Sequence, residues 1–171
     1  MPLCDRARVS VTPQHGITVS SSGEVRRATV ADIDALIEMG RAFLAYSAYG
    51  KSVPFDRDQM AIGLCSILDS GVIFVAEKDA KIIGGIVGIM NGLWFAKDTK
   101  VAAELAWWVA PEYRGGRLSI KLLREFERWG VEQGVKHIVM SDMVIDGEMP
   151  VARLFEKLGY ALVERAHMKG V

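Results

Sequence analysis

The chain has 171 residues, half of them apolar and a quarter charged, and its 21 basic and 21 acidic side chains give a net charge of zero. This length suits one globular domain, which buries about 70% of the surface that its unfolded chain exposes. The neutral charge argues against nucleic-acid binding, because proteins that bind nucleic acids usually carry an excess or a stripe of basic residues.

The sequence contains no segment typical of export, membrane insertion or metal binding. Asp5, Arg6 and Arg8 interrupt the apolar residues at the start of the chain, so we expect no signal peptide. The longest uncharged stretch, Ile82 to Ala96, is shorter than the about 20 residues that span a bilayer. The three histidines are scattered and the two cysteines lack ligand spacing. We therefore expect a cytoplasmic protein with no metal, no membrane partner and no nucleic-acid partner.

Residues 1–23 read as an N-terminal extension that is separate from a domain at residues 24–171. The residues at positions 20–23, three serines and a glycine, have the composition of a linker. Before them, apolar residues alternate around a Pro- and Gly-containing turn, which is typical of a small hairpin. A disordered tail fits equally well, because two isolated strands are only marginally stable.

The domain opens with a short strand at residues 25–28 and a helix that begins at Thr29. Asp32, three residues after Thr29, resembles the second member of a capping box. A loop at residues 46–55 follows, and Asp56 is expected to cap a second helix. Two helices therefore precede most of the strands.

Two strands, at residues 72–77 and 82–90, flank a turn and predict a hairpin. Three glycines in the second strand, at positions 84, 85 and 88, predict a bulge or a close backbone approach. A further strand is expected at residues 101–109. A Gly-rich turn at residues 110–117 then leads into an amphipathic helix that ends near Gln133.

The last part of the domain also alternates strands and helices. The expected elements are a strand at residues 137–141, a helix at residues 150–158 and a strand at residues 160–168. The whole order is β-α-α-β-β-β-α-β-α-β. Hairpins mixed with crossovers predict a mixed sheet with helices on both faces.

The segment from Ala103 to Ser119 carries the clearest chemical signal. It combines a strand, a tight turn with Gly115 and Gly116, and the start of a helix. Glycines allow backbone N–H groups to point toward one spot, and a helix N-terminus adds unsatisfied N–H groups and a partial positive charge. This pattern favours a diphosphate site, although the two glycines could also serve only as a strand–helix turn.

Three segments in this order resemble the GNAT superfamily of acyl-CoA N-acyltransferases. Pro111-Glu112-Tyr113-Arg114-Gly115 and the helix after it are similar to the family's CoA-binding motif. Residues 154–160, Leu-Phe-Glu-Lys-Leu-Gly-Tyr, are similar to its closing motif, and residues 74–85 are similar to its central hairpin. The resemblance implies an α/β (α+β) fold, with a mixed, mostly antiparallel central sheet of about six to seven strands flanked by about four helices.

The resemblance also implies the activity, an acetyl (acyl) transfer from acetyl-CoA to an amine by direct attack in a ternary complex. It places the CoA diphosphate and pantetheine arm along one set of residues. These are Trp108, Val109, Ala110, Arg114, Gly115, Gly116, Arg117, Leu118 and Ser119. Two positions depart from the family pattern, since Arg117 stands where the motif has Gly and Ser119 where it has Gly or Ala.

Catalysis needs a base to remove a proton from the attacking amine. Glu104 lies on the strand that leads to the diphosphate site, where relatives place a carboxylate, although it could instead pair across the sheet. The identity of the general acid stays open, because Phe155 stands where the family often has tyrosine. Asp142 is an alternative acid. Tyr46 and Tyr49 could line the acceptor pocket or be plain surface residues.

Other questions stay open at this level. The partner is a small-molecule or peptide amine that the sequence does not identify, and a homodimer is compatible with the sequence. A catalytically silent module that binds acyl-CoA or another protein is the alternative function. Assembly through residues 1–23 is a further alternative. The four tryptophans are expected in the core, with Trp107 or Trp108 also able to border the acyl group.

Overall fold

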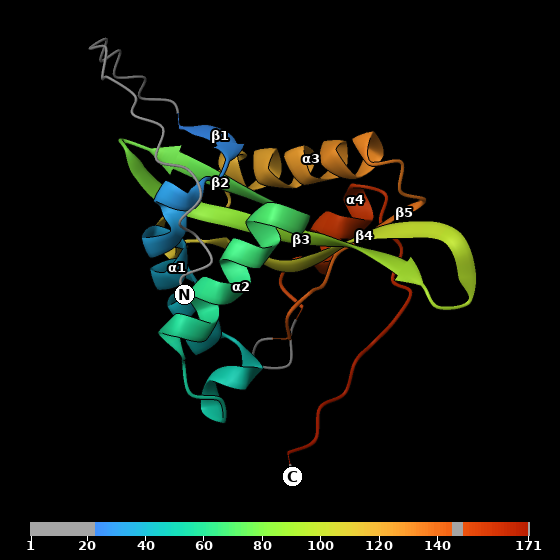
Figure 1. Ribbon diagram of the computed structural model, residues 1–171, viewed down its shortest axis with the longest axis horizontal. Coiled ribbons are helices and arrows are strands. Elements are labelled where there is room, and N and C mark those ends of the chain that lie inside the picture. Colours follow the sequence, from blue (N-terminus) through green and yellow to red (C-terminus); the bar gives the residue numbers. More distant parts are fainter. Residues whose placement is uncertain (1–22, 145–148, 171) are drawn as a thin grey trace. The chain divides into compact units, whose positions relative to one another are not determined.

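A computed structural model describes residues 23–144 and 149–170 of the chain (Figure 1). The chain divides into two compact units, the first ending at Ser141 and the second beginning at Asp142. Each unit is described by itself below. The hairpin or tail expected in the N-terminal extension lies outside the described residues.

The first unit is built on a five-stranded sheet with the strand order β1-β2-β3-β4-β5. The strands are β1 (Glu24–Arg27), β2 (Val72–Lys78), β3 (Lys81–Leu93), β4 (Ala96–Val109) and β5 (His137–Val139). Three neighbouring pairs are antiparallel and the β4–β5 pair is parallel. The sheet is therefore mixed and mostly antiparallel, as the sequence predicts.

Helices cover both faces of this sheet (Figure 1). They are α1 (Ile33–Tyr46), α2 (Arg57–Ser70) and α3 (Arg117–Glu132), with 3-10 turns at Val30–Asp32, Ala48–Lys51 and Pro111–Tyr113. The helices α1 and α2 pack on one face and α3 packs on the other. The second unit contains α4 (Ala152–Lys157). No helix in the described ranges combines the length and apolarity needed to cross a membrane.

Side chains that the sequence marks as caps fix the starts of the first two helices. The carboxylate of Asp32 accepts hydrogen bonds from the backbone N–H and the hydroxyl of Thr29, at 2.8 and 3.1 Å. Asp56 Oδ1 accepts from the N–H of Gln59 at 2.9 Å. Both interactions satisfy donors that the first turn of a helix leaves unpaired.

Gly88 of β3 has no side chain, and this makes room for the core between the sheet and α3. Leu122, Phe126 and Trp129 of α3 are buried against the sheet. A Cβ atom at Gly88 would overlap the ring of Phe126. A Cβ atom at Gly84 would lie 2.8 Å from the backbone carbonyl oxygen of Trp108, so the close backbone approach predicted at the glycines of this strand is confirmed.

A charged cluster that sequence reasoning missed joins β1, β2 and the start of α1. Arg26 forms ion pairs with Asp32 at 2.8 Å and with Glu77 at 2.7 Å. Hydrogen bonding from Arg26 is the largest cause that lowers the pKa of the Asp32 carboxyl to about 2. The three side chains therefore satisfy one another's charges at the edge of the sheet.

The strand expected at residues 160–168 is not formed, and that prediction is wrong. This segment has neither helix nor strand, and Leu162 and Val163 are exposed. A strand exists only when a neighbouring strand accepts and donates its backbone hydrogen bonds. Alternating apolar residues supply the pattern for a strand but do not supply its partner.

The tryptophans differ in environment. Trp108 and Trp129 are buried as expected, and Trp107 is half-buried. Trp94 is 94% exposed, so the expectation that it lies in the core is wrong. It follows the last residue of β3 in the β3–β4 turn and packs edge-on against Phe95, with the ring centroids 5.3 Å apart. Its position in a turn removes it from both faces of the sheet.

Candidate functional site

One half of β4 has a free edge. Its parallel partner β5 pairs only with residues 101–103, and residues 104–109 pair with β3 alone in the described part of the chain. The N–H of Ala110 donates to the carbonyl of Ile83 in β3 at 2.9 Å. Because alternate residues of an antiparallel strand face opposite neighbours, Val109 turns its own N–H and carbonyl toward the free edge. A ligand can pair with the strand there.

A bulge interrupts β4 where the free edge begins. Ala106 pairs with Val87 and Glu104 pairs with Gly88, so Leu105 has no partner in β3. The side chains before and after the bulge consequently face different layers. Ala102 belongs to the core under α3, whereas Ala106 packs with the core under α1 and α2. Bulges of this kind redirect side chains and are frequent beside active sites.

Glu104 lies beside this bulge and directly follows Ala103, which pairs with Val139, the last residue of β5. Its Oε2 accepts a hydrogen bond from the backbone N–H of Ser141 at 3.1 Å. Loss of solvation on burial raises the pKa of the Glu104 carboxyl to about 7, and the bond from Ser141 opposes this shift. A carboxyl with such a pKa exchanges protons near neutral pH, as a general base must.

The turn after β4 suits an anion. Gly115 has a φ of +73°, a left-handed conformation that favours glycine. Gly116 is the N-cap of α3, no side chain caps this helix, and no acidic residue lies in its first turn. A Cβ atom at Gly116 would have only one neighbour, the carbonyl of Tyr113 at 3.4 Å. The first N–H groups of α3 therefore open into space that a diphosphate can fill.

Arg114 connects this turn with the free edge. Its Nε donates to the carbonyl of Val109 at 3.0 Å. Its guanidinium lies 4.5 Å from the ring centroid of Trp108 and 4.7 Å from that of Tyr46. Trp108 and Tyr46 also pack edge-on, with centroids 5.3 Å apart. Both candidate acceptor residues are exposed, and of the two Tyr46 packs against Trp108 and Arg114 at the edge.

A groove of about 640 Å³ starts at Trp108 and Ala110 and runs along α1 to the Arg26 cluster. Its lining consists of Arg26, Ala31, Asp32, Ala35, Glu38, Met39, Ala42, Glu77, Ala80, Lys81, Ile82, Ile83, Trp108 and Ala110. It is large enough for a small molecule and adjoins the expected CoA path.

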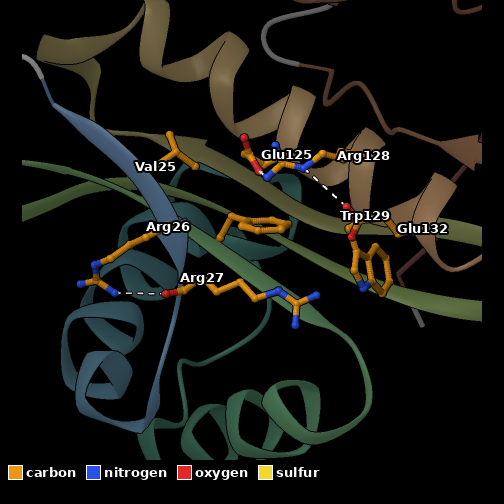
Figure 2. Close-up of a pocket in the computed structure, with 8 residues that line it drawn as sticks. Val25, Arg26, Arg27, Glu125, Arg128, Trp129 and Glu132 are labelled. Carbon is orange, nitrogen blue, oxygen red and sulfur yellow. Dashed lines mark hydrogen bonds and ion pairs between the residues drawn. The ribbon is translucent and has the colours of Figure 1, made fainter.

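A second, smaller hollow of about 240 Å³ lies between β1 and α3 (Figure 2). Figure 2 shows Arg27 extending from β1 and Arg128 from α3, whereas the guanidinium of Arg26 points away from α3. Arg128 is paired with Glu125 and lies 3.7 Å from Glu132. This hollow contains none of the residues that the sequence assigns to catalysis or CoA binding, and the charge of Arg128 in it is already paired with Glu125 and Glu132.

The candidates for a general acid lie in the second unit. The Asp142 carboxylate accepts from the N–H of Val151 at 3.5 Å, and burial raises the pKa of Asp142. The rings of Phe155 and Tyr160 are 5.4 Å apart. These contacts are internal to the second unit, so they give neither Asp142 nor Tyr160 a role toward Glu104.

Several site features could not be read from residue types. Sequence reasoning placed Glu104 and residues 108–119 on one continuous segment, and the fold holds them at one strand edge and one helix start. It missed the N–H of Ser141 and the aromatic contact of Phe43 with Trp108 at 6.1 Å. Ser141 was expected within the strand at residues 137–141, whereas β5 ends at Val139, so the first contact had no signal in the sequence. The second had no local signal.

The model of the Acetyltransferase (GNAT) family matches residues 39–160 of the chain. This range contains most of the sheet, α3, the free edge and the turn with Gly115 and Gly116. No curated protein matches the sequence at the significance used.

Solved structures match the fold over most of the chain. An acetyltransferase from Trypanosoma brucei has a TM-score of 0.68 at 18% identity and covers 88% of this chain and 100% of its own. The aminoglycoside N-acetyltransferase AAC(6')-Iy, solved with CoA, has a TM-score of 0.69 at 16% identity, covering 91% and 98%. A glucosamine-6-phosphate N-acetyltransferase from Arabidopsis thaliana has a TM-score of 0.68 at 15% identity, covering 87% and 98%. At these identities the likeness concerns the fold alone.

Proposed function

The chain belongs to the GNAT family of acetyltransferases, and on this premise we propose that it transfers an acetyl group from acetyl-CoA to an amine by direct attack in a ternary complex. The free edge of β4 and the start of α3 form the binding path for CoA in this proposal. Residues 108–110 run beside the pantetheine arm, which pairs with the backbone groups of Val109, and residues 114–119 hold the diphosphate.

One observation carries the proposal: Glu104 and the N-terminus of α3 lie at opposite ends of the same free edge. Six strand residues span roughly 20 Å at about 3.3 Å per residue. A long, thin ligand with a diphosphate at one end fits such a path. Its other end then lies beside the carboxyl whose pKa of about 7 suits a base.

The proposed reaction needs only proton transfer and positioning from the protein. Acetyl-CoA supplies the activated carbonyl as a thioester. The amine nitrogen forms a bond to this carbonyl carbon, the carbon–sulfur bond breaks, and the sulfur leaves as the CoA thiolate. Glu104 accepts the proton that the nitrogen loses, directly or through one water. A thiolate is a good leaving group, so transfer can proceed without a tyrosine acid at Phe155.

The acceptor binds, in this proposal, on the side of β4 that Tyr46 and the groove along α1 approach. Neutral net charge favours neither acidic nor basic acceptors. A screen of small amines, polyamines, aminoglycosides and peptide N-termini, with free CoA thiol as the readout, identifies the class.

Thermal unfolding with acetyl-CoA tests the binding half of the proposal. At about 100 times the dissociation constant, a ligand adds roughly 2.7 kcal/mol to the free energy of unfolding. For this chain length the melting temperature should rise by about 5–10 °C. No shift at millimolar acetyl-CoA or CoA would refute the binding path. Binding without CoA release for any amine would favour the catalytically silent module.

A further inference from the structure

Arg114 contacts two parts of the candidate site at once. Its guanidinium stacks on the rings of Tyr46 and Trp108, while its Nε donates to the carbonyl of Val109. Tyr46 is the last residue of α1, and the loop proposed to meet the acceptor starts there. No acidic side chain in the described ranges forms an ion pair with Arg114. Arg114 is exposed, and the contacts of its side chain in the described residues are with two rings and one neutral carbonyl.

The carbonyl that Arg114 covers lies between the two halves of the proposed CoA path. Val109 is the last residue of β4, and the turn with Gly115 and Gly116 follows it. A ligand with its diphosphate at α3 and its arm along residues 104–109 has to pass this carbonyl. In this structure, Arg114 occupies part of that path.

We propose that Arg114 competes with CoA for its binding path. The rings of Tyr46 and Trp108 hold the Arg114 guanidinium over the carbonyl of Val109, an arrangement that we call the clamp, and Arg114 has to leave the clamp when CoA binds. The inference rests on the proposed function, because it takes CoA as the ligand of the edge. A diphosphate is a stronger acceptor for a guanidinium than a neutral carbonyl is. The arriving diphosphate therefore draws Arg114 from Val109 toward the start of α3.

Release of the clamp has a consequence on the acceptor side. Tyr46 loses the cation on its ring, and a positive charge moves away from the segment where a protonated amine approaches. Tyr46 thus lowers the affinity for CoA without touching CoA, and bound CoA makes the neighbourhood of Tyr46 more favourable for a cation. Binding free energies couple reciprocally in this way.

A double-mutant cycle on CoA affinity tests the clamp. Calorimetric titration with CoA gives the dissociation constant for the wild type, Tyr46→Leu, Arg114→Gln and the double variant. Tyr46→Leu removes one ring of the clamp, so CoA should bind about threefold more tightly, the size of one exposed cation–π contact. In the presence of Arg114→Gln, the same change should have no effect.

Two control variants isolate the contact. Tyr46→Phe keeps the ring and should leave CoA affinity unchanged. Arg117→Gln removes the other arginine of the turn, which makes no ring contact with Tyr46 in the described residues. CoA affinity should fall, and Tyr46→Leu should still raise it about threefold in that background. If Arg114→Gln does not fold, Arg114→Lys replaces it, since an ammonium lacks the planar group that stacks on both rings.

The possible results separate the two proposals. If CoA binds the wild type and Tyr46→Leu acts equally with and without Arg114→Gln, the clamp is wrong and the proposed acetyl transfer stands. If Tyr46→Leu leaves CoA affinity unchanged in the wild type, the clamp is also wrong. If CoA does not bind the wild type at all, the proposed function falls and the clamp falls with it.

Discussion

The ring of Phe126 in α3 occupies the space that a side chain on Gly88 of β3 would fill. Phe126 is fully buried, and it packs against Trp129 with the two ring centroids 5.7 Å apart. The contact fixes the height of α3 over the sheet. Because the proposed diphosphate site is the first turn of α3, the same contact supports the position of that site relative to β4.

Gly88→Ala should destabilise the protein by about 1–3 kcal/mol, since the added methyl group forces Phe126 or the strand to move. The melting temperature should fall by about 2–4 °C for each kcal/mol. Gly92→Ala is the matched control in the same strand, because a Cβ atom there has no neighbour within 4 Å. Equal stability of the two variants in urea unfolding would contradict the packing described.

Gly116→Asp should separate folding from CoA binding. Gly116 is an N-cap with extended backbone, φ −84° and ψ 170°, which any residue can adopt. An aspartate there accepts N–H groups of the first turn and carries a charge that the helix end favours, so the protein without ligand should gain up to about 1 kcal/mol. The same carboxylate occupies and repels the diphosphate, so CoA binding should be lost. Gly116→Ser, a cap without charge, should weaken binding less. Wild-type CoA affinity in the aspartate variant would show that the site is elsewhere.

Glu104→Gln should lower kcat by about 100-fold and leave the dissociation constant of acetyl-CoA nearly unchanged, because the proposed role is proton transfer. The wild-type rate should rise with pH along one limb with a midpoint near the pKa of about 7, and this limb should disappear in the variant. The profile is measured with the best amine from the acceptor screen. An unchanged profile in Glu104→Gln would remove Glu104 from the mechanism and leave water or the amine as the base.

The same carboxyl should affect stability with a definite sign. Its pKa is about 7 in the folded chain against 4.5 as the ordinary value. Between these values the folded state holds more protons than the unfolded state, so the free energy of unfolding should decrease as pH rises from about 4.5 to 7. Glu104→Gln should remove this decrease and be more stable than the wild type at pH 8.

Urea unfolding from pH 5 to 8 measures this difference. The Asp32 carboxyl does not interfere, because its pKa is lowered from 3.8 to about 2 and its stabilisation is lost only below that range of measurement. A wild type and a Glu104→Gln variant with parallel pH profiles would show that Glu104 is solvated like an ordinary surface carboxyl.

Elements with a local cause were predictable from the sequence. The buried face of α3 follows from the spacing of Leu122, Phe126 and Trp129, and the start of α2 follows from Asp56. These signals lie within a few residues of the structure that they produce. The turn with Gly115 and Gly116 was predictable for the same reason, because backbone conformation there depends on the glycines themselves.

Features that depend on a distant partner were not predictable. The bulge at Leu105 and the direction of the Val109 carbonyl follow from the register of β4 against β3, which no single strand specifies. Arg114 was expected at the diphosphate, and its contact with Tyr46 joins residues 68 positions apart. The expected strand at residues 160–168 failed for a related reason, since its own alternation could not supply a neighbour.

The one-sided pairing of the second half of β4 divides its amide protons into two classes. Trp107 and Val109 turn their N–H groups to the free edge, whereas Trp108 and Ala110 turn theirs to β3. Deuterium should therefore replace alternate amide protons of this strand at very different speeds in the free protein. A bound ligand that pairs with the edge should slow the fast class alone, and the two-residue alternation along a single strand should fade.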